Sequence, residues 1–180
     1  MIDIIMFFAP IGVFFLIFKT FMTQGFSTIL ELASYFFTVL LVLIIHFFLT
    51  YGTLLFLLTK VRLVYFYSKM KNAILFAFST ASSAATIPVT LKTVEEELKV
   101  EKSVASFSVP LGATINMDGT AIMQGVATIF IANAYGINLE ISDFISVIMV
   151  ATLASIGTAG VPGVGLIMLA MVLNQVGLPS

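Results

Sequence analysis

Cysteine and tryptophan are absent from this chain of 180 residues, and only 9% of its residues are charged. Without cysteine the chain offers no disulfide framework, no thiol nucleophile and no thiolate metal site. Soluble domains carry about 25% charged residues, so the low share here excludes an ordinary soluble domain. The chain has instead 60% hydrophobic residues and a mean hydropathy of +1.15, which predicts an integral membrane protein.

Positive charge is concentrated in one part of the chain. Seven of the eight lysines and arginines lie between positions 60 and 102, whereas residues 144–180 carry no charge. Loops rich in lysine and arginine stay on the cytoplasmic side of a membrane. The region 60–102 is therefore expected to be cytoplasmic. The protein is expected to be a multi-pass protein of a bacterial-type inner membrane.

Five apolar stretches are long enough to cross or enter a bilayer, since a spanning helix needs about 20 residues. They predict transmembrane helices over 4–23 and 32–59, a hairpin over 72–98, a broken helix over 103–134 and a hairpin over 144–176. The expected fold class is an all-α membrane protein. It combines broken transmembrane helices with two oppositely oriented re-entrant helical hairpins.

The two hairpins are predicted from charge and composition. The uncharged stretch 72–91 has lysines on both flanks, and these are expected on one side of the membrane. Its centre, 79–88, and the segment 155–165 are both rich in small and hydroxyl-bearing residues, and each contains an Ile-Pro or Val-Pro pair. We expect each to form a non-helical hairpin tip. Paired interrupted segments of opposite orientation indicate a transporter site near the bilayer midplane.

Asp118 is the only charge in the apolar run 103–139. A carboxylate at bilayer depth costs roughly 2.5 to 3.5 kcal/mol on insertion scales, so such a residue is usually functional. Gly119 weakens the helix beside it, and Asn116 and Thr120 add oxygen ligands at the same depth. A structural aspartate bonded to a neighbouring helix is the alternative. The oxygen ligands of Asn116 and Thr120 favour the interpretation of Asp118 as a sodium ligand.

Hard cations prefer carboxylate, amide, hydroxyl and backbone carbonyl oxygens as ligands. The broken helix offers all four kinds near Gly112, Thr114, Asn116, Asp118 and Thr120. The tip of the second hairpin adds Ser155, Ile156 and Thr158. Free backbone amides near Ser82 and Ser83 suit a carboxylate, as helix N-termini do, and Met117 adds adaptable apolar surface.

Three segments resemble the signature segments of the dicarboxylate/amino acid:cation symporters, the glutamate transporter family. They are residues 79–88 (STASSAATIP), 110–120 (PLGATINMDGT) and 155–163 (SIGTAGVPG). The resemblance covers nearly all of the chain but less than half of the family's usual length, which implies a C-terminal transport-domain fragment. Paired interrupted hairpins are themselves known from this family, so the repeat noted above is no independent support.

The resemblance also implies an architecture and residue roles. Residues 1–31 are expected to form a scaffold-type transmembrane helix and outer loop, and 32–180 a partial transport domain without its final helix. The family works as a homotrimer by an elevator mechanism, in which the second hairpin gates the outside. One implied sodium site contains Gly112, Asn116 and Asp118. A second implied sodium site contains Thr114, Ser155, Ile156 and Thr158. The implied solute contacts are Ser83, Thr120, Val161 and Gly165, with Ser82 beside them.

The expected function is sodium-coupled secondary active symport of a small carboxylate solute, which is an acidic or neutral amino acid or a C4-dicarboxylate. Ala81 stands where some members of the family have arginine, so the choice of solute stays open. Sodium is the cofactor expected. The expected partners are the solute, sodium ions, the lipid bilayer and further copies in a homotrimer, with no nucleic acid. Because the family continues beyond the position of Ser180, the chain is expected to carry only part of the site.

Other functions were compatible with parts of this pattern. A non-transporting fragment and an ion-conducting channel of the same fold stay open. An intramembrane hydrolase is a remote alternative, because aspartyl chemistry needs paired carboxylates and only Asp118 lies within an apolar run. His46 is interpreted as a structural, hydrogen-bonded histidine rather than a proton carrier. No enzymatic activity is expected.

Overall fold

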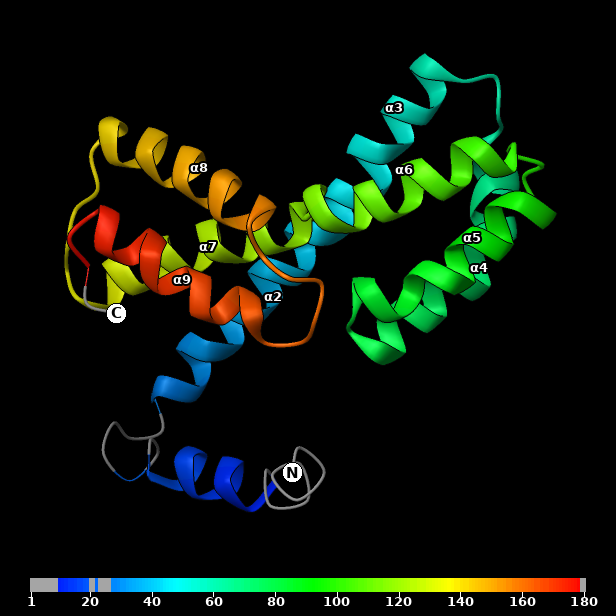
Figure 1. Ribbon diagram of the computed structural model, residues 1–180. Coiled ribbons are helices and arrows are strands. Elements are labelled where there is room, and N and C mark those ends of the chain that lie inside the picture. The colour runs from blue at the N-terminus through cyan, green and yellow to red at the C-terminus, as the bar shows by residue number, and fades with distance from the viewer. Residues whose placement is uncertain (1–9, 20–21, 23–26, 179–180) are drawn as a thin grey trace. The chain divides into compact units, whose positions relative to one another are not determined.

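The computed structural model describes residues 10–19, 22 and 27–178, which form helices joined by short tips and loops, with no strand among them (Figure 1). The chain divides into two compact units, Met1–Thr38 and Val39–Ser180. The first holds a helix over Pro10–Lys19 and the beginning of α2 (Ser27–Ile45). Part of the predicted span 4–23 lies outside the described residues. The elements after α2 are, in chain order, η1 (His46–Thr50), α3 (Tyr51–Leu58), α4 (Leu63–Thr80), α5 (Ser83–Glu96), α6 (Lys102–Ile115), α7 (Asp118–Ala134), α8 (Ile141–Ile156) and α9 (Val164–Gln175).

One helical run, Leu30–Leu58, is long and apolar enough to cross a membrane by its length and composition. It corresponds to the predicted span 32–59, but it is not α-helical throughout. The five residues of η1 form a π-helix between α2 and α3. A π-turn closes hydrogen bonds between residues five apart, so it changes which side chains share a face of the helix.

The first helical hairpin consists of α4 and α5, which pack along each other (Figure 1). Its tip is only Ala81 and Ser82, whereas the sequence predicted a non-helical tip over 79–88. The tip is short because Ala81 reverses the chain in a left-handed conformation, with φ of 47°, and Ser82 then caps α5. The Ser82 hydroxyl accepts the backbone N–H of Ala85 at 3.2 Å.

The helix break lies between α6 and α7. Asn116 and Met117 leave the helical conformation, with ψ of 77° and 47°, and Asp118 is the first residue of α7. This is the interruption that the sequence predicted inside 103–134. The Met117 carbonyl accepts the N–H of Thr120 at 3.0 Å, which starts the new helix.

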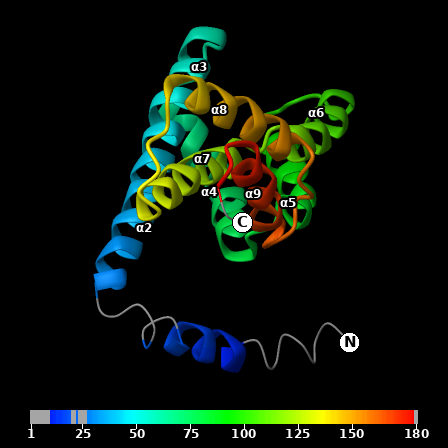
Figure 2. The ribbon, with the colours of Figure 1, turned by 90° about the vertical axis from the view of Figure 1, so that its left-hand side faces the viewer.

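The second helical hairpin, α8 and α9, packs against α7 (Figures 1 and 2). Its tip follows Ile156 and ends at Gly163, whose φ of 85° is in the left-handed region that favours glycine. Both hairpins therefore have the predicted sequence of helix, tip and helix. How deeply their tips lie in a bilayer stays a prediction.

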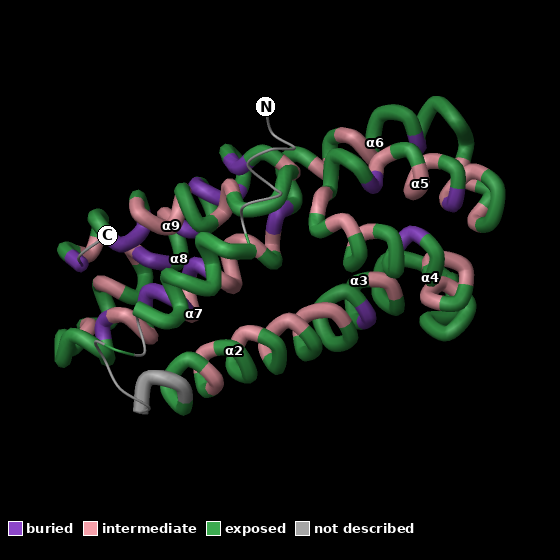
Figure 3. The backbone as a smooth tube through the Cα atoms, turned by 90° about the horizontal axis from the view of Figure 1, so that it is seen from below, coloured by how far each residue is buried: buried purple, intermediate pink, exposed green. Residues whose placement is uncertain are grey.

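Most of the buried residues lie where α7, α8 and α9 face one another (Figure 3). Their core is made of small and medium apolar side chains: Ala132, Val147, Ala151, Ala154, Val172, Leu173 and Leu178. Many large apolar side chains elsewhere are exposed, such as Phe78 at 86% and Val64 at 83%. Apolar surface of this extent is typical of a chain that meets lipid or further protein.

Candidate functional site

Asp118 is the centre of a polar cluster at the helix break. Its Oδ2 accepts a hydrogen bond from the Tyr51 hydroxyl at 2.6 Å and lies 3.0 Å from Nε2 of His46. The two side chains of the His46–Asp118 pair are partly exposed, at 22% and 35%. The carboxylate is therefore satisfied by donors from another helix, although it lies in an otherwise apolar run.

The π-helix η1 explains why His46 and Tyr51 reach the same carboxylate. In an α-helix, residues five apart point about 140° away from each other. In η1, the backbone N–H of Tyr51 donates to the carbonyl of His46, which stacks the two residues one turn apart. Their rings meet edge to face with centroids 4.9 Å apart. Both side chains therefore point at Asp118 from one face.

Asn116 completes the cluster. With its amide in one orientation, its Nδ2 donates to the Tyr51 hydroxyl oxygen at 3.2 Å, and its oxygen then faces the Asp118 carboxylate. With the amide turned over, its NH2 donates to Asp118 Oδ1 at 2.5 Å and lies 3.2 Å from Oδ2. The turned orientation is favoured without a cation, because two acceptors side by side repel each other. The first orientation presents two oxygens together, as a cation site requires.

A cavity of about 500 Å³ opens beside this cluster. Its polar lining comes from the helix break, from η1 and α3, and from Ser83 at the start of α5, and the rest of its lining is apolar. The break contributes Asn116, Met117, Asp118, Gly119 and Thr120. An apolar cavity with a few convergent polar groups is the usual form of a small-molecule site.

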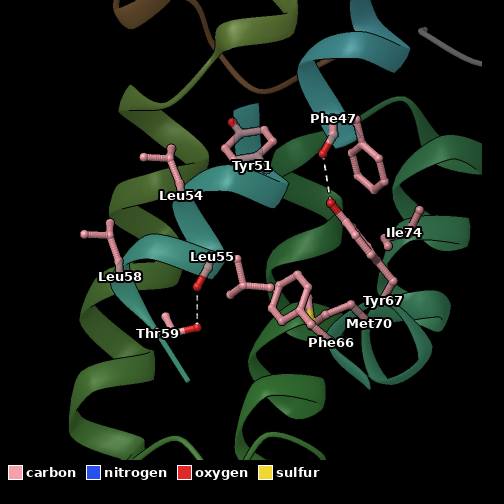
Figure 4. A pocket seen from close by; sticks show the side chains of 10 residues that line it. All are labelled: Phe47, Tyr51, Leu54, Leu55, Leu58, Thr59, Phe66, Tyr67, Met70 and Ile74. Carbon is pink, nitrogen blue, oxygen red and sulfur yellow. Dashed lines mark hydrogen bonds between the residues drawn. The ribbon is translucent and has the colours of Figure 1, made fainter. Parts of the chain in front are cut away.

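A second cavity, of about 450 Å³, lies between α3 and α4 and is lined mainly by aromatic and aliphatic side chains (Figure 4). The Tyr67 hydroxyl donates to the carbonyl of Phe47 at 2.8 Å, inside η1 (Figure 4). Because its lining offers almost no polar group, this cavity does not suit an ion or a carboxylate. The hydrogen bond from Tyr67 in its lining connects α4 to the π-helix.

The tips of the two hairpins meet. The carbonyl of Gly160, in the second tip, accepts the Ser82 hydroxyl at 2.8 Å and the Ala84 N–H at 3.1 Å. A Cβ at Gly160 would lie 3.1 Å from the Ala84 nitrogen and 3.5 Å from the Met117 methyl carbon. Glycine is therefore needed for the tips to approach, and this contact brings Ser82, Ser83 and Met117 to one place.

A second close approach joins α7 to the start of α9. A Cβ at Gly165 would lie 3.0 Å from the Thr120 methyl group, so these two predicted solute contacts are neighbours. The Gly165 carbonyl accepts the side-chain N–H of Gln124 at 3.1 Å. Gln124 is fully buried, and among the described residues its Oε1 has no hydrogen-bond partner. Sequence reasoning missed Gln124, although an amide in an apolar run was a usable signal.

The second implied sodium site is only partly assembled. Ser155 and Thr158 are buried, and their hydroxyls donate to the carbonyls of Thr152 and Ala154, both at 2.8 Å. A hydroxyl that donates its proton along its own helix keeps lone pairs for a cation. Thr114 donates likewise to Pro110, but Thr114 and Ile156 are exposed.

Besides Ser155, Ile156 and Thr158, three predicted residues lie apart from the Asp118 cluster: Gly112, Thr114 and Val161. Gly112 lines a separate cavity of about 280 Å³ that also contains Ser83. Val161 is 47% exposed, beside Gly160. In the described part of the chain, no hydrogen bond joins Thr114 to the second hairpin. The residues brought together are thus Asn116, Met117, Asp118, Thr120, Ser82, Ser83 and Gly165.

One ion pair lies outside the candidate membrane span. Lys69 on α4 donates to Glu97, just after α5, at 2.6 Å. Hydrogen bonding to Lys69 and its charge lower the pKa of Glu97, and the same contact raises the pKa of Lys69. The pair joins the two ends of the first hairpin at the side that is expected to be cytoplasmic.

Known proteins are similar to this chain over nearly all of its length. Residues 1–180 match the sodium:dicarboxylate symporter family along their whole length. The chain is 40% identical to human excitatory amino acid transporter 1 over 182 aligned residues, which are 100% of this chain and 34% of the relative. It is 41% identical to mouse excitatory amino acid transporter 3 over 180 residues, which are 99% of this chain and 34% of the relative. The chain thus spans about a third of the length of these relatives.

These relatives change some of the expectations. Transporters are not enzymes, so the intramembrane hydrolase is excluded. A symporter is an integral membrane protein, as predicted, but these relatives are animal proteins and give no support to a bacterial-type inner membrane. In a symporter, sodium is a transported ion and not a cofactor. On the match of all 180 residues, this chain belongs to the sodium:dicarboxylate symporter family.

Proposed function

We propose that this chain carries part of the ion and solute site of a sodium-coupled symporter for small carboxylate solutes. The observation that carries the proposal is the pairing of Asp118 with Asn116 at the helix break, at the edge of a cavity that also contains Ser83. Relatives described as excitatory amino acid transporters support the same class of solute.

Sodium suits the oxygens at the break. The Asp118 carboxylate supplies the negative charge, and Asn116 supplies an amide oxygen once its side chain turns toward the cation. Backbone carbonyls at the end of α6 add to this set, because the last carbonyls of a helix lack partners in the next turn. Sodium also removes the cost of a bare carboxylate at bilayer depth.

A carboxylate solute suits the other side of the cavity. Ser83 is the first residue of α5, and the helix dipole at that end favours an anion. The N–H groups of Ala84 and Ala85 are already bonded to Gly160 and Ser82, so the Ser83 N–H and hydroxyl are the donors left for the solute. Thr120 lines the same cavity and offers a hydroxyl. This geometry is compatible with acidic amino acids, neutral amino acids and C4-dicarboxylates, since each has at least one carboxylate.

Coupling follows from the contact between the hairpin tips. With Gly160 bonded to Ser82 and Ala84, the two tips are held together, and we take this contact as the closed form. Ions and solute that bind this closed form better than the open one shift the equilibrium toward closure. Occlusion of this kind favours a transporter over a channel. The elevator movement and the homotrimer belong to the same proposal.

Uptake into liposomes tests the proposal. The native-length protein, meaning residues 1–180 with any chain that flanks them in the cell, is reconstituted and supplied with radiolabelled aspartate, serine or succinate. At least one solute should accumulate only with an inward sodium gradient, and Asp118→Asn should abolish the accumulation. The control Glu95→Gln removes a carboxylate near the end of α5, at the opposite end from Ser83, and should have no effect. Equal uptake without sodium, or an unaltered Asp118→Asn variant, would contradict the proposal.

A further inference from the structure

We propose that Tyr51 and His46 hold Asp118 in a sodium-free state, because their hydrogens bond the carboxylate oxygen that sodium would coordinate. These two hydrogen bonds to Asp118 are called the lock. The inference rests on the proposed function, because it assumes that Asp118 is a sodium ligand. It adds two residues outside the broken helix and the hairpins to the ion site. It also assigns them an opposing role: they compete with the ion and do not coordinate it.

The geometry at Oδ2 supports competition. The Tyr51 hydroxyl donates to this oxygen at 2.6 Å, and Nε2 of His46 lies 3.0 Å from the same atom. A hydrogen that points at a carboxylate oxygen carries partial positive charge and occupies a lone pair, so a cation cannot approach along that direction. With the Asn116 amide turned over, a third donor bonds the other carboxylate oxygen, Oδ1, at 2.5 Å and lies 3.2 Å from Oδ2.

The π-helix makes the lock a single unit. Because η1 stacks Tyr51 one turn above His46, both donors leave Asp118 together if this part of the helix rotates or relaxes toward α-helical geometry. Tyr67 holds the carbonyl of Phe47 at 2.8 Å and so stabilises η1 from α4. Single π-turns within α-helices occur frequently at functional sites, which agrees with a movable element here.

The consequence is coupling between the ion and the helix that carries the lock. Sodium binding replaces the donors of Tyr51 and His46, turns the Asn116 amide oxygen inward and frees α3 from the break. By thermodynamic reciprocity, whatever holds α3 against Asp118 weakens sodium binding by the same factor. The lock therefore sets the sodium affinity of the site and suppresses ion binding until α3 moves.

Equilibrium binding of radioactive sodium to the native-length protein tests the lock. Tyr51→Phe keeps the ring and removes the donor, so sodium should bind about tenfold more tightly, a change of ~1.4 kcal/mol. His46→Leu should also tighten binding. The control Tyr65→Phe removes a hydroxyl that lies 3.4 Å from the Glu97 carbonyl, away from Asp118, and should leave binding unchanged. Weaker or unchanged binding in Tyr51→Phe overturns the lock, and weaker binding would make Tyr51 a sodium ligand.

A second measurement follows the contact between His46 and Asp118 in the wild-type protein. His46 is the only histidine among residues 1–180, so its ring nitrogen signal can be assigned by comparison with His46→Leu. Sodium should shift the Nε2 signal of His46 in the wild-type protein, because its contact with Asp118 is lost. An unchanged signal at saturating sodium contradicts the lock. If wild-type protein binds no sodium at all, or if Asp118→Asn binds it normally, the proposed function fails before the lock is tested.

Discussion

Gly160→Ala should separate the tips of the two hairpins. The added Cβ would lie 3.1 Å from both the Ala84 nitrogen and the Ser83 Cβ. The nitrogen belongs to backbone that is itself bonded to Gly160, so it cannot move away without breaking that bond. Overpacking of this kind costs about 1–3 kcal/mol if the tips stay together. If the tips separate instead, the two hydrogen bonds to the Gly160 carbonyl are lost.

The two hydrogen bonds set the expected change in free energy between the closed and the open arrangement of the tips. The Ser82 hydroxyl and the Ala84 N–H both donate to the Gly160 carbonyl. Each such bond contributes about 1 kcal/mol net, because the separated groups bond to water instead. The closed arrangement should therefore lose about 2 kcal/mol relative to the open one, which lowers the ratio of closed to open forms by about 30-fold.

Spin-label distances measure this ratio. Because the chain has no cysteine, labels can be placed by single substitutions such as Phe78→Cys on α4 and Ile167→Cys on α9, at positions 86% and 71% exposed. In Gly160→Ala the distance distribution should broaden and move outward. The control is Gly125→Ala, since a Cβ there meets nothing within 4 Å. If Gly160→Ala and the parent give the same distribution, the tip contact does not hold the hairpins closed.

Two further predictions concern the ends of the hairpins. Gln124→Met removes the bond to the Gly165 carbonyl, worth about 0.5–1.5 kcal/mol, so amides in the first turn of α9 should exchange up to about tenfold faster; unchanged exchange would show that Gln124 does not secure α9. Glu97→Gln should lower thermal stability at pH 7, where Glu97 is ionised against Lys69. Because the pKa of Glu97 is lowered below its ordinary 4.5, this difference should persist above that pH and vanish as acid protonates Glu97 in the folded protein. Glu95→Gln is the control, and a difference that persists in strong acid would contradict the ion-pair explanation.

The broken helix and the two hairpins could be predicted because composition marks them. A lone carboxylate beside Gly119, and tips rich in small and hydroxyl-bearing residues, are local signals. The predicted extent of the first tip, 79–88, was wrong. The Ser82 cap allows α5 to begin at Ser83, and Pro88 is accommodated inside that helix. Composition alone does not show where a cap will start a helix.

The role of His46 and Tyr51 could not be predicted in the same way. Residues five apart point in different directions in an α-helix, and no residue type marks a π-helix in the sequence. His46 was correctly interpreted as hydrogen-bonded, but its partner lies 72 positions away, and Tyr51 was not considered. The pairing depends on side-chain contacts between η1, Tyr51 and the break, which a single sequence does not reveal.

Coupled flux of sodium and solute tests the proposed symport most directly, because it asks whether the solute drives sodium across the membrane through Asp118. In liposomes that contain the native-length protein, the influx of radioactive sodium is measured with and without an external carboxylate solute, at zero membrane potential. The solute should increase sodium influx in a fixed ratio to its own uptake, and Asp118→Asn should abolish both. Solute uptake with no accompanying sodium, or sodium influx that ignores the solute, would contradict the proposed symport.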